Sequence, residues 1–428
     1  MTTLDTKLIE KYHRLGPRYF TYPSPRFWQK SEKEQSKFIK NDGGNLSVYI
    51  HIPFCESFCS YCGCNIKVTK DHSNEKKILK EIKSELLQYS NSLHGNTLGE
   101  LYLGGGTPTF LSPENLKTLI GQIFDFFPKS SDFVGTIEVD PRVTTTGHLD
   151  VLKECGFSKL QIGVQDTDSK TLKSVNRFIE KDQLFRFMGE AHARFNHIGI
   201  DLIYGLPNQT LEGLAATAND LKTINADSVS VYPLAHVPWL KGQGGCETPN
   251  AIDKTILGAF LSNTLFENNY SELGMGHFSK NDGELFSLLK EGKLQKNIMG
   301  YTKAMTTATL GLGVGSISEY QGAYFQNDRV LEKYRHLLKN GKPLARSHIL
   351  TPMDKEIKNA MGKIMCGNRI EFSDLKAIFN ETPQDQISEI YRGFIEDKIL
   401  TTVGEGYTIT KLGRSFLKPL CLTLDGHL

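Results

Sequence analysis

The stretch YIHIPFCESFCSYCGCN, residues 49–65, places four cysteines within ten positions, directly after a segment that alternates like a β-strand. These cysteines are Cys55, Cys59, Cys62 and Cys64. The N-terminus carries charges throughout and resembles neither a signal peptide nor a membrane span, so we expect a cytoplasmic protein. In a reducing compartment, clustered thiols are more often metal ligands or catalysts than disulfides.

The cysteine spacing bears on which metal the loop would hold. A structural zinc site commonly joins two cysteine pairs that lie about a dozen or more residues apart, and this loop is too short for that arrangement. An iron–sulfur cube is larger, and a Cys-x3-Cys-x2-Cys loop can reach three of its irons while the fourth stays open. The spacing favours a cluster; a zinc loop or a redox-inactive group of thiols is the alternative.

Six segments rich in β-branched or aromatic residues predict strands that alternate with helices. Strict alternation implies parallel strands with right-handed crossovers, and therefore an α/β fold. Helical patterns fill residues 74–89, the segment after the Ser112–Pro113 cap, the segment that ends near Gly156, and residues 210–224. The predicted strands are residues 46–53, 99–105, 135–141, 159–166, 198–205 and 227–235.

Polar or glycine-rich motifs follow the C-terminal ends of these strands, among them GGGTPT, EVDPR and GVQD. In a barrel all such ends meet at one mouth, whereas a doubly wound sheet would spread them along an edge. We therefore predict a partial (βα)6 TIM-like barrel. The motif GLGVGS after residue 310 lacks the third glycine and the strand–helix unit of a dinucleotide site, so we do not expect nicotinamide binding.

The chain divides into three predicted parts: an N-terminal arm of residues 1–45, a barrel with its extension over 46–345, and a smaller, mainly helical domain over 346–428. The last part is similar to a winged-helix module, with a hairpin before its final helix. Because it lacks clustered basic residues, we interpret it as a packing or lid domain rather than a DNA-binding one. A net charge of +2 likewise gives no general case for nucleic acid or membrane partners.

The cysteine loop resembles that of the radical S-adenosylmethionine (SAM) superfamily. The fourth cysteine, together with GPRYFTYP, LGGGTPTFL, IEVDPR, VNR and GYT in the family's order, is similar to the oxygen-independent coproporphyrinogen III oxidase branch. The resemblance implies that Cys55, Cys59 and Cys62 hold a [4Fe-4S] cluster and that Tyr61 lies near the cofactor. It implies no ligand role for Cys64, which could equally be a bystander thiol.

The same resemblance implies two SAM molecules per site. Glu138 and Asp201 could instead be satisfied barrel carboxylates. His51 is a candidate substrate or radical-site contact, although a strand histidine is more often hydrogen-bonded to backbone in the core. The cofactor-binding residues that the resemblance implies are Tyr49, Tyr61, Gly105, Gly106, Thr107, Glu138, Gln165, Arg177, Asp201, Ala235 and Ile317.

The activity that the resemblance implies is oxidative decarboxylation of two propionates of coproporphyrinogen III to vinyl groups by 5'-deoxyadenosyl radicals, with an external one-electron donor. We expect a monomer. The anionic tetrapyrrole needs cationic groups, for which Arg18 and Arg26 are candidates unless they are merely solvated. Met299 and Gly276 depart from the family's usual glutamine and aspartate, so a haem chaperone or an enzyme for another tetrapyrrole is the alternative.

Overall fold

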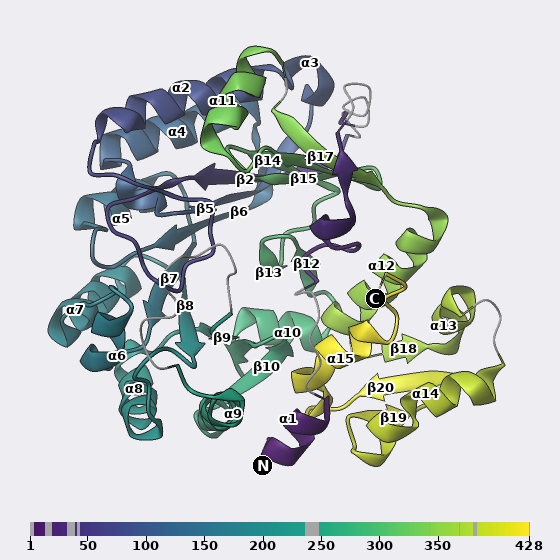
Figure 1. Ribbon diagram of the computed structural model, residues 1–428. Coiled ribbons are helices and arrows are strands. Elements are labelled where there is room, and N and C mark those ends of the chain that lie inside the picture. The colour runs from purple at the N-terminus through teal and green to yellow at the C-terminus, as the bar shows by residue number, and fades with distance from the viewer. Residues whose placement is uncertain are drawn as a thin grey trace.

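A computed structural model describes residues 4–12, 19–31, 39–40, 43–235, 248–341, 343–367, 369–379 and 383–427. One large sheet dominates these residues, and helices pack on its outer face (Figure 1). Its strand order is β1-β17-β16-β15-β14-β2-β5-β6-β7-β8-β9-β11-β10.

All six predicted strands are present and lie side by side in chain order, with every neighbouring pair parallel. A doubly wound sheet would reverse its order around the first strand, so this order confirms the predicted partial barrel. Their buried positions form one core with the inner faces of the helices. The strands are β2 (Asn45–Ile52), β5 (Thr97–Gly105), β6 (Lys129–Val139), β7 (Lys159–Gln165), β8 (His197–Tyr204) and β9 (Ser228–Pro233).

The predicted helices form the connections between these strands. Ser112 accepts a hydrogen bond from the backbone N–H of Asn115 and so caps its helix, and Gly156 has a φ of +84° just after the next one. The crossover helices are α2 (Ser73–Leu87), α4 (Pro113–Phe126), α5 (Thr146–Glu154), α6 (Ser169–Ser174), α7 (Lys181–His192) and α8 (Leu211–Ile224).

Antiparallel strands extend the sheet at both edges, so the barrel stays open. β14 (Ala308–Leu312) adds a further parallel strand beside β2, which the sequence did not predict. The GLGVGS turn joins β14 to β15 (Ile317–Tyr320), an antiparallel neighbour, rather than to a helix. The other extension strands are β16 (Ala323–Asn327), β17 (Leu344–Ile349), β1 (Gln29–Lys30), β11 (His277–Lys280) and β10 (Tyr270–Gly274).

A short hairpin, β12 (Gln295–Asn297) and β13 (Gly300–Thr302), borders the barrel interior. Asn297 and Thr302 both donate to the buried carboxylate of Glu100 on β5, at 2.7 and 2.9 Å. The remaining elements around the barrel are β3 (Phe54–Cys55), β4 (Lys67–Val68), α3 (Ser90–Leu93), η3 (Pro108–Phe110), α9 (Ala251–Glu267), α10 (Glu284–Lys290) and α11 (Leu331–Lys339).

The C-terminal part contains a three-stranded antiparallel sheet, β18-β20-β19, with helices around it, which is the predicted winged-helix-like arrangement. N-terminal residues Leu4, Tyr12, Tyr19 and Tyr22 share its hydrophobic core. Its elements are α12 (Pro352–Cys366), β18 (Arg369–Glu371), α13 (Phe372–Ile378), α14 (Gln384–Glu396), β19 (Leu400–Thr402), β20 (Gly406–Ile409), η4 (Gly413–Phe416) and α15 (Leu417–Leu422), and the N-terminal arm adds α1 (Thr6–Tyr12) and η1 (Pro25–Phe27).

The three-part division of the chain stays a prediction. β17 spans residues 344–349, so it crosses the predicted boundary between the second and third parts. Within the ranges given above, no helix is both long enough and apolar enough to cross a membrane.

Candidate active site

The cysteine loop leaves the barrel at the C-terminal end of β2. β3 and β4 pair in parallel, with Phe54 opposite Lys67 and Cys55 opposite Val68, so the loop between them is closed at its base. The N–H of Thr69 also donates to the carbonyl of Cys55, at 2.9 Å. Backbone hydrogen bonds therefore fix the conformation at the base of the loop.

The tip of the loop packs against the segment after α6. The N–H of Ser60 donates to the carbonyl of Val175 at 3.2 Å, and the Asn176 amide donates to the carbonyl of Phe58 at 2.7 Å. Asn176 has a φ of +55°, a left-handed conformation that asparagine tolerates better than most residues. The VNR motif thus holds the loop in place.

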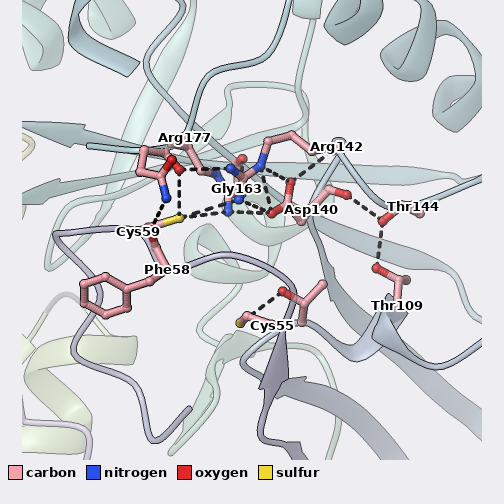
Figure 2. A network of polar contacts seen from close by, with 11 residues as sticks. Cys55, Phe58, Cys59, Thr109, Asp140, Arg142, Thr144, Gly163 and Arg177 are labelled. Atoms are coloured by element: carbon pink, nitrogen blue, oxygen red, sulfur yellow. Dashed lines mark hydrogen bonds and ion pairs between the residues drawn. The ribbon is translucent and has the colours of Figure 1, made fainter. Parts of the chain in front are cut away.

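Cys59 lies beneath two arginines, as Figure 2 shows. The Nη2 of Arg142 is 3.5 Å from the Cys59 sulfur, and the Nη1 of Arg177 is 3.7 Å from it. Asp140, directly after β6, forms ion pairs with both guanidiniums, at 2.7 Å each. Burial opposes ionisation of Asp140, but the charge of Arg177 and the hydrogen bonds from Arg142 hold the pKa of Asp140 below its usual range.

The other cysteines have different surroundings. The Cys55 sulfur is 3.4 Å from the hydroxyl of Thr107, and burial raises the pKa of the Cys55 thiol to about 11. A hydrogen bond from Cys64 lowers the pKa of Cys62 to about 6, and the same interaction raises the pKa of Cys64. Cys64 is exposed and contacts the predicted ligand Cys62, a contact that the sequence did not predict.

The glycine-rich end of β5 lies directly against the cysteine loop. The N–H groups of Gly106 and Thr107 donate to the carbonyls of Ile52 and Phe54, at 2.8 and 2.9 Å. A Cβ on Gly106 would lie 2.8 Å from the Phe54 carbonyl oxygen and 3.0 Å from the Cys55 sulfur. Gly105 has a φ of +117°, which side chains rarely allow. Glycine is therefore required for this close approach.

The barrel interior holds the predicted carboxylates. Glu138 accepts from the Tyr102 hydroxyl at 3.0 Å and from the N–H of Gly105 at 3.1 Å. Asp201 accepts from the Gln161 amide at 2.8 Å. Burial, together with the charge of Asp201, raises the pKa of Glu138 to about 7, and burial raises the pKa of Asp201 to about 6. Both are therefore hydrogen-bonded barrel carboxylates as well as candidate ligands.

These two carboxylates line a cavity of about 180 Å³ inside the barrel. Met299, at the turn of the β12–β13 hairpin, also lines it. Gly276 does not line the cavity, although the next residue, His277, does. Gly276 lies in the β10–β11 turn, with a φ of +79° and its N–H donating to Glu272 at 3.0 Å. A Cβ on Gly276 would lie 2.4 Å from the Val231 carbonyl oxygen, so an aspartate there would need a different turn.

His51 is buried on β2 with both ring nitrogens engaged. One lies 2.9 Å from the Asn65 carbonyl, and the other lies 3.0 Å from the Tyr49 hydroxyl. Burial lowers the pKa of His51. This environment is the backbone-bonded core histidine that was the alternative prediction, and it ties β2 to the end of the cysteine loop.

The other predicted cofactor contacts lie around the same mouth. Gln165 ends β7 with a φ of +70° and is buried, and Tyr61 hydrogen-bonds the Cys59 thiol. Ile317 starts β15 and is half-buried, whereas Ala235 is exposed just after β9.

The two predicted substrate arginines are not brought to the cysteines by described contacts. Arg18 lies outside the described residues. Arg26 is exposed in η1, and its guanidinium stacks over the ring of Phe27 at 4.5 Å. Arg142, Asp140 and Asn176 are site residues that sequence reasoning missed, although EVDPR and VNR carried the signal.

Comparison with known proteins supports this assembly. The family model described as the radical SAM superfamily matches residues 49–221. The oxygen-independent coproporphyrinogen III oxidase of Helicobacter pylori is 32% identical, over 100% of this chain and 98% of that protein. The chain belongs to this oxidase family.

Other members of the oxygen-independent coproporphyrinogen III oxidase family match equally broadly. The Escherichia coli protein of that name is 31% identical, over 99% of this chain and 95% of the relative. The solved structure of coproporphyrinogen III oxidase from Escherichia coli, described as a radical SAM enzyme, has a TM-score of 0.90 at 29% identity and covers 99% of both chains. The family predicted from the sequence is confirmed.

Membership of the radical SAM superfamily implies a [4Fe-4S] cluster and SAM as cofactors. The donor set fits a cluster, because one short loop supplies all three thiols and Gly106 allows that loop to pack tightly against the end of β5. Within the part of the chain that the structure describes, no group of three or more His, Cys, Asp or Glu side chains is arranged to hold a single metal ion. Sulfurs that bind separate corners of a cube lie farther apart than the ligands of one ion.

Proposed function

We propose that this chain converts coproporphyrinogen III to protoporphyrinogen IX without oxygen, by oxidative decarboxylation of two propionate side chains to vinyl groups. The observation that carries the proposal is the cysteine loop seated over the glycine-rich end of β5, in a chain that matches the oxidase family over its whole length. When bound, the cluster and SAM supply the one-electron chemistry that removes a hydrogen from a propionate.

In this proposal Cys55, Cys59 and Cys62 hold three irons of the cluster. Gly105, Gly106 and Thr107 offer backbone and hydroxyl groups to SAM, because glycine lets a ligand approach the strand end closely. Tyr61, Tyr49, Ala235 and Ile317 supply packing or backbone contacts.

The barrel carboxylates suit a cationic ligand. Burial disfavours the charged forms of Glu138 and Asp201 and raises their pKa values to about 7 and about 6. A sulfonium or ammonium group would favour ionisation of both carboxyls. We propose that they, together with Gln165 and Arg177, divide between two SAM molecules.

Several further parts of the proposal concern partners. We propose that the protein receives electrons from an external one-electron donor, is a monomer and is located in the cytoplasm. Arg26, exposed beside the barrel extension, and Arg18 are proposed contacts for the substrate carboxylates. His51 is proposed as a substrate or radical-site contact, and its bond to Asn65 also positions the end of the cysteine loop.

A second candidate function is a haem chaperone or an enzyme for another tetrapyrrole. Met299 favours it, because a thioether lines the cavity where the resembled family carries an amide. A chaperone would bind haem tightly and leave coproporphyrinogen III unchanged.

The test is anaerobic. The protein is reconstituted with iron and sulfide and mixed with SAM, a strong reductant and coproporphyrinogen III; 5'-deoxyadenosine and protoporphyrinogen are then quantified. We expect both products from the unaltered chain and from C155A, which alters a cysteine at the end of α5, but neither product nor a full cluster from C59A. 5'-Deoxyadenosine without decarboxylated product would refute the substrate, and an intact cluster in C59A would refute the ligand set.

A further inference from the structure

Asp140, Arg142 and Arg177 form a charged triad beside Cys59 (Figure 2). Both guanidiniums pair with the same oxygen of Asp140, Oδ2, at 2.7 Å. The side chains are 7%, 18% and 12% exposed, in that order. The triad is therefore largely withdrawn from water, where charge interactions are stronger than at the surface.

The triad carries a net positive charge that faces the Cys59 sulfur. Two guanidiniums and one carboxylate leave one positive charge, and both Arg142 and Arg177 direct an N–H to the Cys59 sulfur, at 3.5 and 3.7 Å. This net positive charge suits a negatively charged group bound at Cys59.

Backbone contacts hold both arginines in this position. The Nη1 of Arg142 donates to the Asn176 carbonyl at 3.1 Å, and the Nη2 of Arg177 donates to the Gly163 carbonyl at 2.8 Å. A Cβ at residue 163 would lie 2.6 Å from that Nη2 atom. If either arginine turned away from Cys59, it would lose one of these hydrogen bonds and its ion pair with Asp140, so these contacts hold the charge in place.

We propose that Arg142 and Asp140 set the reduction potential of the cluster that Cys59 holds: the Arg142 charge raises the potential and the Asp140 charge lowers it. Adding an electron makes the cluster more negative, and a nearby positive charge stabilises that reduced state. Charge and hydrogen bonds at ligand sulfurs are known levers on cluster potential. The inference rests on the proposed role of Cys59. It concerns Arg142 rather than Arg177, because Arg177 is a proposed SAM contact.

The experiment is a potentiometric titration of the reconstituted protein without SAM, followed by the electron paramagnetic resonance signal of the reduced cluster. R142Q is expected to shift the potential downward and D140N to shift it upward. R142K, which keeps the positive charge, is expected to have a potential close to the wild-type value. The matched control is R194Q, which removes an arginine whose Nε pairs with Asp150 at 2.7 Å on the outside of the barrel and should leave the potential unchanged.

Opposite signs for R142Q and D140N separate a charge effect from loosening of the loop, which would move both variants the same way. Potentials that stay at the wild-type value, or that shift together, overturn the inference. If R142Q holds no cluster, the titration of D140N is the deciding measurement. Any result for D140N other than an upward shift of the potential then refutes the inference. Failure of the wild-type protein to form a cluster would refute the proposed function as well, whereas a wild type that cleaves SAM alongside unshifted variants refutes only this inference.

Discussion

Glu85 on α2 is fully buried and accepts three hydrogen bonds behind the β14–β15 turn. The donors are the N–H of Gly313 at 2.8 Å, the Asn327 amide at 2.6 Å and the Tyr334 hydroxyl at 2.7 Å. They come from three separate parts of the chain, so this one carboxylate joins α2 to the turn, to β16 and to α11. We predict that E85L destabilises the barrel strongly.

The magnitude follows from the groups left behind. Leucine accepts no hydrogen bond. The Asn327 amide also donates to the Gly313 carbonyl and the Ser316 hydroxyl, so two donors, the Gly313 N–H and the Tyr334 hydroxyl, lose their partner. Each buried donor without a partner costs about 1–3 kcal/mol, so the two cost roughly 2–6 kcal/mol. At about 2 °C per kcal/mol for a domain of this size, the melting temperature should fall by roughly 4–12 °C. E85Q should lie between, because an amide oxygen still accepts while its NH2 group faces donors.

Differential scanning calorimetry of the metal-free protein measures the effect without any contribution from cluster binding. The control is E332Q on α11, whose side chain is 76% exposed and pairs with Arg335 at 3.0 Å. An exposed pair contributes under about 1 kcal/mol, so E332Q should melt close to the wild type. An E85L protein that melts together with E332Q would refute the reasoning.

Three further predictions concern the ionisation of Glu85, the glycine beside the cysteine loop and a buried arginine in the C-terminal part. Burial raises the pKa of Glu85 to about 7 from 4.5, so the folded state binds more protons and stability falls as pH rises between these values; melting curves of E85Q should show a smaller fall than wild type. G106A should hold less iron after reconstitution because its Cβ would meet the Phe54 carbonyl, whereas G121A, with open space around its Cβ, should load normally. R414Q should destabilise the C-terminal part by roughly 2 kcal/mol or more, measured by urea unfolding, because the buried Arg414 donates to three carbonyls at the end of α12; an unchanged midpoint would contradict this.

Local pattern was enough to predict the central strands and the helices between them. Each of the six strands is a short run bounded by turn residues, and Ser112 and Gly156 carry their capping signals within a few positions. The cysteine loop could be predicted equally well, because its four cysteines lie within ten consecutive residues. Nothing local predicted that residues 308–312 pair in parallel with β2, since that contact joins segments more than 250 residues apart.

The amino-acid sequence alone shows the alternation of strands and helices, the clustering of the three thiols and, through its motifs, the family. The folded structure was needed to show that Arg142 and Arg177 face one sulfur, that Glu85 supports the β14–β15 turn, and that His51 bonds to the backbone of Asn65. The physical reason is range: strand and helix patterns depend on neighbours along the chain, whereas a buried charge is stabilised by whichever partners the fold brings within about 3–4 Å.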